Sequence, residues 1–101
     1  MNAAERLLQV TQLQLQTEHA IARRQYEIRR EQVLLRYRPI RDRAVEIAEI
    51  GRAAYREGGT DLLRLLDSER LRTETQLAYV RMLRSYHQSV IELERAGGIE
   101  P

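Results

Sequence analysis

Hydrophobic residues recur at steps of three and four positions along most of the chain, which is the spacing of one face of an α-helix. From Ala3 to Tyr37 neither glycine nor proline interrupts this pattern. The pattern therefore predicts a first long helix over residues 3–38. Its apolar residues are Leu7, Leu8, Val10, Leu13, Leu15, Ile21, Ala22, Tyr26, Ile28, Val33, Leu34 and Tyr37.

Pro39 is the first residue that disturbs this helix. Proline has no N–H to donate, and it disfavours the α conformation of the residue before it, here Arg38. The sequence therefore predicts a kink or a short break near Pro39, followed by a second helix over residues 40–57. The apolar face of this second helix contains small residues, among them Ala44, Ala48 and Gly51, which permit close packing against another helix.

The pair Gly58–Gly59 predicts a tight reversal over residues 58–60. Glycine suits the left-handed position that closes a helix, so we assign Gly58 to it. Thr60 or Asp61 can then cap the next helix, which we expect over residues 61–96. Gly97 and Gly98 end that helix and leave a tail over residues 97–101.

These elements predict an all-α fold, a long antiparallel helical hairpin of the coiled-coil kind. The last helix would span roughly 54 Å, and the segment before the turn roughly 80 Å if Pro39 did not break it. Two arrangements account for the unequal lengths. Either the first arm folds back near Pro39 and makes a three-helix bundle, or its unpaired end is available to another chain or a missing segment.

Composition supports this fold class. Hydrophobic residues make up 43% and charged residues 32% of the 101 residues, with no phenylalanine or tryptophan. This balance is typical of a long amphipathic helix or coiled coil rather than of a compact enzyme. A chain of this length buries a limited core if it folds alone, so we expect it to depend on a partner or on its own copies. The absence of cysteine excludes disulfides and thiolate metal sites.

Candidate catalytic and metal-binding chemistry is absent from the sequence. His19 and His87 are isolated, with no second histidine or carboxylate at the spacing of a zinc site. No nucleophile, base and orienting group are brought together on helices that carry three aspartates, two histidines and no cysteine. We therefore expect no enzyme activity, no cofactor and no metal. Tyr26, Tyr37, Tyr79 and Tyr86 are interpreted as packing residues.

An arginine-rich stretch raises the question of nucleic-acid binding, because phosphate neutralisation needs clustered positive charge. Glu27, Glu31 and Asp42 interleave with these arginines and can pair with them within the helix, and the net charge of the chain is only +2. We therefore expect a salt-bridged, solvated face and no nucleic-acid partner. The eight arginines are Arg23, Arg24, Arg29, Arg30, Arg36, Arg38, Arg41 and Arg43.

The turn and the helix after it carry a longer motif, with a small residue, Tyr55 and Gly58 at fixed spacing and then apolar pairs followed by Asp67. Over residues 48–98 this series resembles the C-terminal repeat of the TolC-like outer-membrane efflux proteins, and most closely their heavy-metal, CzcC-like branch. The stretch Tyr37 to Ala44, "YRPIRDRA", also resembles the segment before that motif. The matching positions are Gly51, Tyr55, Gly58, Leu62, Leu63, Leu65, Leu66, Asp67, Arg70, Gln76, Tyr79, Tyr86 and Leu93 to Gly98.

The resemblance implies a part of a trimeric conduit, in which helical hairpins form a periplasmic tunnel below an outer-membrane β-barrel. The hairpin tips of that family meet a periplasmic adapter protein, which links them to an inner-membrane pump. Tyr55 would stack or form a hydrogen bond near the tip, and the two leucines would offer apolar contacts. The implied tip residues are Tyr55, Gly58, Gly59, Thr60, Leu62 and Leu63.

Asp67 matches a position at which members of the family can place a carboxylate facing the pore. Threefold repetition would concentrate negative charge there and favour cations. Arg64 precedes Asp67 by one helical turn and can neutralise it as an i, i+3 pair.

The family also has an export signal, a second copy of the helical unit and barrel strands, which this sequence lacks. Its first ten residues have no basic segment followed by a long apolar run, and no stretch is long and apolar enough to span a membrane. We expect a chain that is soluble as given and is a piece or a truncated relative of a channel, from the periplasmic part of an outer-membrane protein. The alternative is a stand-alone helical module that associates with itself, for example as a dimer.

Overall fold

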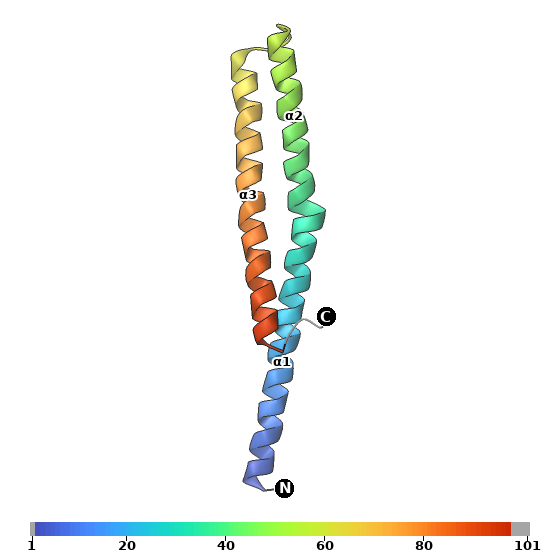
Figure 1. Ribbon diagram of the computed structural model, residues 1–101, viewed down its shortest axis with the longest axis vertical. Coiled ribbons are helices and arrows are strands. Elements are labelled where there is room, and N and C mark those ends of the chain that lie inside the picture. The colour runs from blue at the N-terminus through green and yellow to red at the C-terminus, as the bar shows by residue number, and fades with distance from the viewer. Residues whose placement is uncertain (1, 98–101) are drawn as a thin grey trace. The chain divides into compact units, whose positions relative to one another are not determined.

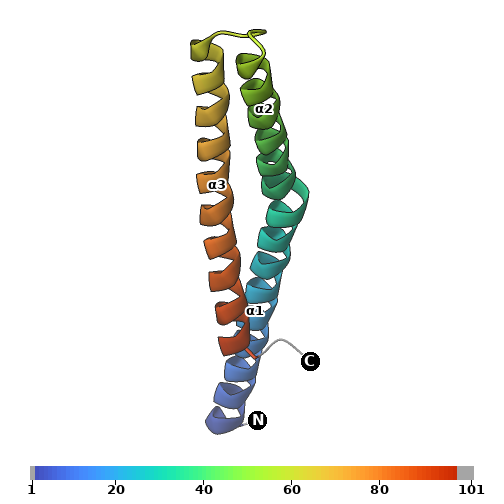
Figure 2. The ribbon, with the colours of Figure 1, turned by 45° about the horizontal axis from the view of Figure 1, so that its top comes forward.

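The computed structural model of the chain describes residues 2–97 and consists of helices and their connections over these residues. The elements are α1 (Ala3–Gln32), a π-helical segment η1 (Val33–Tyr37), α2 (Arg38–Arg56) and α3 (Leu62–Arg95). Helix α2 and the first part of α3 lie side by side in opposite directions and are joined by a short turn (Figures 1 and 2). The predicted all-α helical hairpin is confirmed.

A kink or a short break is predicted near Pro39, and the break does not occur. Gln32, Tyr37 and Arg38 all have right-handed helical backbone angles, and the chain stays helical up to Arg56. A wide turn precedes the proline instead, because the N–H of Arg38 donates to the carbonyl oxygen of Val33, five residues back. Proline removes a donor and crowds the carbonyl four residues before it, and a π-turn accommodates both effects without ending the helix.

This result also corrects the predicted boundaries around the proline. Helix α1 ends at Gln32, six residues before the predicted end at residue 38, and α2 already begins at Arg38. A first arm that folds back at Pro39 to make a three-helix bundle is therefore wrong, because such a reversal needs non-helical residues there.

Contacts divide the chain into two units. The hairpin unit is Glu31–Arg84, and the terminal unit combines Met1–Arg30 with Ser85–Pro101. Of the terminal unit, the structure describes residues 2–30 and 85–97.

Small residues hold the two helices of the hairpin unit close together, as the sequence predicts. Ala44 and Ala48 are buried. A Cβ atom added at Gly51 would lie 2.8 Å from the Oγ of Ser68, so α2 and α3 approach too closely there for a larger residue without rearrangement. Further along, the guanidinium of Arg41 lies over the ring of Tyr79, 4.4 Å from its centroid. Such stacking covers the ring with the arginine side chain.

Aromatic packing and one buried leucine define the terminal unit. The rings of Tyr26 and Tyr86 meet edge to face with centroids 5.7 Å apart, and Leu93 is fully buried. A hydrogen bond with Tyr26, together with burial, raises the pKa of Tyr86. The interpretation of these two tyrosines as packing residues is confirmed.

Helix α3 ends at Arg95, close to its predicted end at residue 96. Gly97 follows with a positive φ of 136°. A Cβ atom added at Gly97 would approach the ring of His19 to 3.2 Å, so this glycine fits beside the histidine. Gly98 and the rest of the predicted tail lie outside the described residues.

Candidate functional site

The reversal between α2 and α3 is built by hydrogen bonds that close α2. The N–H of Gly58 donates to the carbonyl of Tyr55 at 3.1 Å, and the N–H of Gly59 donates to the carbonyl of Ala54 at 2.7 Å. Gly58 has a φ of +80°, which is the left-handed conformation. Together these features make a Schellman motif, in which Gly58 occupies the position that favours glycine. The prediction for Gly58 is confirmed.

Gly59 has a different role from Gly58. Its φ is not positive, and a Cβ atom added to it would meet the Ala54 carbonyl oxygen at 3.5 Å, an ordinary van der Waals distance. Of the two glycines, only Gly58 therefore adopts a backbone conformation that needs glycine.

Helix α3 begins with a side-chain cap from Asp61. Its Oδ1 accepts a hydrogen bond from the backbone N–H of Arg64 at 2.9 Å, three residues into the helix. The cap satisfies one of the free N–H groups at the helix start. Of the two predicted caps, Asp61 is therefore the one that is used. The turn runs from Glu57 to Asp61, slightly longer than the predicted residues 58–60.

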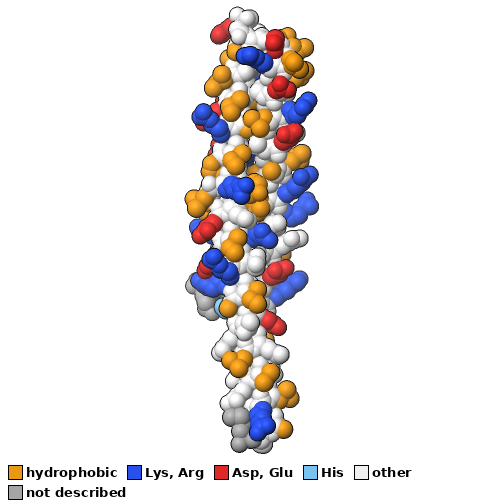
Figure 3. Space-filling view, turned by 180° about the vertical axis from the view of Figure 1, so that it is seen from behind, with side chains coloured by type: hydrophobic (Ala, Val, Ile, Leu, Met, Phe, Trp, Pro, Cys, Tyr) orange, Lys and Arg blue, Asp and Glu red, His pale blue; other side chains and the backbone are white. Residues whose placement is uncertain are grey.

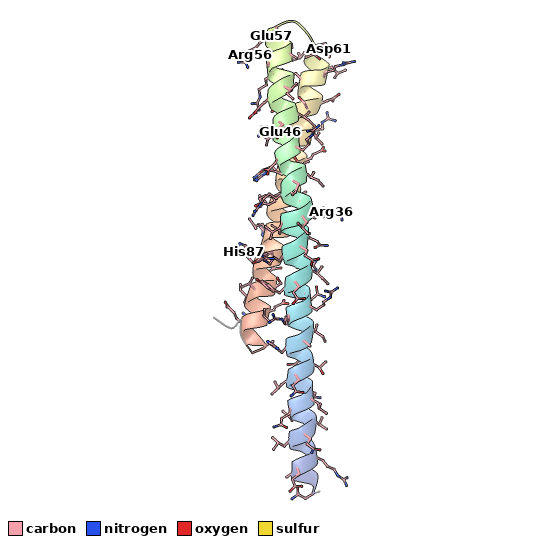
Figure 4. All side chains as sticks on the ribbon, turned by 90° about the vertical axis from the view of Figure 1, so that its right-hand side faces the viewer. Arg36, Glu46, Arg56, Glu57, Asp61 and His87 are labelled. Carbon is pink, nitrogen blue, oxygen red and sulfur yellow. The ribbon has the colours of Figure 1, made fainter. Side chains whose placement is uncertain are left out.

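Large apolar side chains are exposed where α3 begins. Leu62, Leu63 and Leu66 are 53%, 69% and 54% exposed, and Tyr55, at the end of α2, is also exposed. The Tyr55 ring makes neither a stacking contact nor a hydrogen bond with another described side chain. Figure 4 labels Arg56, Glu57 and Asp61 around the turn. We call Tyr55, the turn and the three leucines the hairpin tip.

Arg64 and Asp67 follow on the exposed surface of α3. The structure forms no ion pair between these two side chains, so the pairing suggested by their i, i+3 spacing is not made. Two charges that remain in water gain little from contact, so the absence of this pair costs the chain little stability. Asp67 and Arg64 are thus available as separate charges just beyond the tip.

A charged cluster that joins α2 to α3 lies next to these residues. The guanidinium of Arg52 donates to both carboxylate oxygens of Glu69, with Nη2 3.2 Å from Oε2. Arg72 Nε donates to the same Oε2 at 3.1 Å. Hydrogen bonds from Arg52 and then Arg72 lower the pKa of Glu69, and the Glu69 carboxylate raises the pKa of Arg52. The cluster connects the two helices below the tip.

The Arg52–Glu69 pair was missed by the sequence analysis. The available signal was opposite charge on the two sides of a predicted reversal. That signal identifies a pair only when the rotation of each helix about its axis is known.

The arginine-rich stretch forms the intrahelical pairs that were predicted for two of its acids. Glu27 accepts from Arg23 at 3.4 Å and lies 3.9 Å from Arg24, and Asp42 pairs with Arg41 at 2.8 Å. The side chains of Glu27, Arg23 and Arg24 are about half or more exposed. Such pairs divide the positive charge into small, solvated groups.

Two further features of residues 2–97 concern metal binding and membrane insertion. No three His, Asp or Glu side chains in this range are grouped so that they can hold a metal ion. No helix in the same range is long and apolar enough to cross a membrane.

Comparison with known proteins adds no relative. No family model, curated protein or solved structure matches the chain. The functional interpretation therefore depends on the residues and geometry described above.

Proposed function

We propose that this chain is part of the periplasmic helical tunnel of a TolC-like efflux protein of the heavy-metal branch, and that its hairpin tip docks a periplasmic adapter. The family assignment comes from the resemblance of residues 48–98 to that family. The observation that supports docking at the tip is a capped reversal between two helices that presents Leu62, Leu63 and Leu66 to solvent. Three copies would line a conduit below the outer membrane. The adapter would connect them to an inner-membrane pump, which chooses the cargo.

Docking at the tip would be a passive, apolar contact. Fully burying a leucine side chain contributes about 1.5–3 kcal/mol, so the tip leucines provide enough apolar surface for a specific contact. The hydrogen bonds of Gly58, Gly59 and Asp61 hold the turn in one conformation before binding. A preorganised turn reduces the entropy lost on association.

Asp67 would carry the selectivity of the tunnel entrance, if the threefold arrangement places it at the pore. Its carboxylate is not neutralised by an ion pair with Arg64, so three copies would attract cations over short distances. Arg64 is also exposed, and at longer range its charge cancels that of Asp67. The expected preference for cations is therefore local and weak.

The docking proposal is tested by measuring the affinity of the full chain for a purified periplasmic adapter. The adapter is taken from an efflux system of the cells that produce the chain. Replacing Leu62 and Leu63 together by serine should lower the affinity roughly tenfold or more, because apolar anchors at the centre of a contact carry most of its energy. Circular dichroism should show unchanged helix content. An affinity equal to that of the unmodified chain would contradict the proposal.

A second candidate function is a helical module that associates with itself. The supporting observation is the small core: among the large side chains of residues 2–97 only Val33 and Leu93 are buried, and α1 contributes no buried residue. Figure 3 shows hydrophobic side chains spread over the visible surface between charged groups. Self-association predicts a thermal unfolding midpoint that rises with protein concentration, and a constant midpoint would contradict it.

A further inference from the structure

We draw no further inference here: the strongest candidate, the apolar groove between α2 and α3 that is lined by Ile40, Ile47 and Leu71, is an exposed face of the hairpin unit, and nothing in the structure shows what covers it.

Discussion

The guanidinium of Arg52 on α2 binds both carboxylate oxygens of Glu69 on α3, and Arg72 binds the same carboxylate from one turn away. These contacts connect the two helices below the turn. The leucines of the tip follow the turn, which the hydrogen bonds of Gly58, Gly59 and Asp61 hold.

Stability should depend on pH through Glu69. Its pKa is lowered in the folded state by hydrogen bonds from Arg52 and Arg72. The stabilisation is therefore complete above the ordinary glutamate pKa of about 4.3. It is lost as the pH falls through the lower pKa of the folded chain, because the carboxyl group must then be protonated.

Urea unfolding at pH 7 and pH 3 measures this effect. The unmodified chain should be more stable than Glu69→Gln at pH 7, and the difference should shrink at pH 3 and in high salt, since these side chains are in contact with solvent. Glu74→Gln, an exposed change on the same helix, is the control and should give no such difference. A Glu69→Gln difference that is independent of pH would contradict the role of the carboxylate.

The two glycines of the turn should respond differently to alanine. Gly58→Ala forces a side chain into the left-handed conformation and should lower the free energy of unfolding by about 1–2 kcal/mol. Gly59→Ala has no such strain and should change it by less than about 0.5 kcal/mol. Urea unfolding followed by circular dichroism compares them, and equal losses would show that Gly58 is not the left-handed residue.

Gly51 and Ser68 should be energetically coupled. A Cβ atom at position 51 displaces the Ser68 hydroxyl, which now donates to the Leu65 carbonyl at 2.8 Å. Alanine also has a helix propensity roughly 1 kcal/mol better than glycine. Gly51→Ala should therefore stabilise a Ser68→Ala chain by more than it stabilises the unmodified chain.

A double-mutant cycle of these two substitutions measures the coupling, which we expect at about 1 kcal/mol. A coupling energy near zero would mean that α2 and α3 are further apart at Gly51 than the structure places them.

Replacing Leu63 should weaken adapter binding without lowering the stability of the fold. The side chain is 69% exposed, so Leu63→Ser should change the free energy of unfolding by less than about 0.5 kcal/mol. It should nevertheless weaken adapter binding if the tip is the docking site. Ile91→Ser, an exposed change near the end of α3, serves as the control for surface hydrophobicity. Equal binding losses in both variants would argue against a contact specific to the tip.

The local features of the turn could be predicted from the sequence. Gly58 is identified by the conformational freedom of glycine, and the cap of α3 is narrowed to Thr60 or Asp61, because both side chains can accept from the first N–H groups of a helix. Both depend on a few neighbouring residues. For this reason the position of the reversal follows directly from the sequence.

Other features could not be predicted from neighbouring residues alone. They depend on how the helix adapts to a proline, or on how each helix is rotated about its own axis. The rule for proline predicts a kink or a short break at Pro39, but the chain stays helical through it and a π-turn precedes the proline. The pairing of Arg52 with Glu69 and the separation of Arg64 from Asp67 depend on helix rotation and solvation. Adapter docking depends on a second protein and stays a prediction.

The most direct test of the proposed function is the mass and membrane fraction of the native gene product, detected in its own cells with an antibody against this hairpin. The efflux proposal predicts a product several times larger than 11.9 kDa in the outer-membrane fraction. A product of 11.9 kDa outside the membrane fraction would contradict it and would favour the self-associating module.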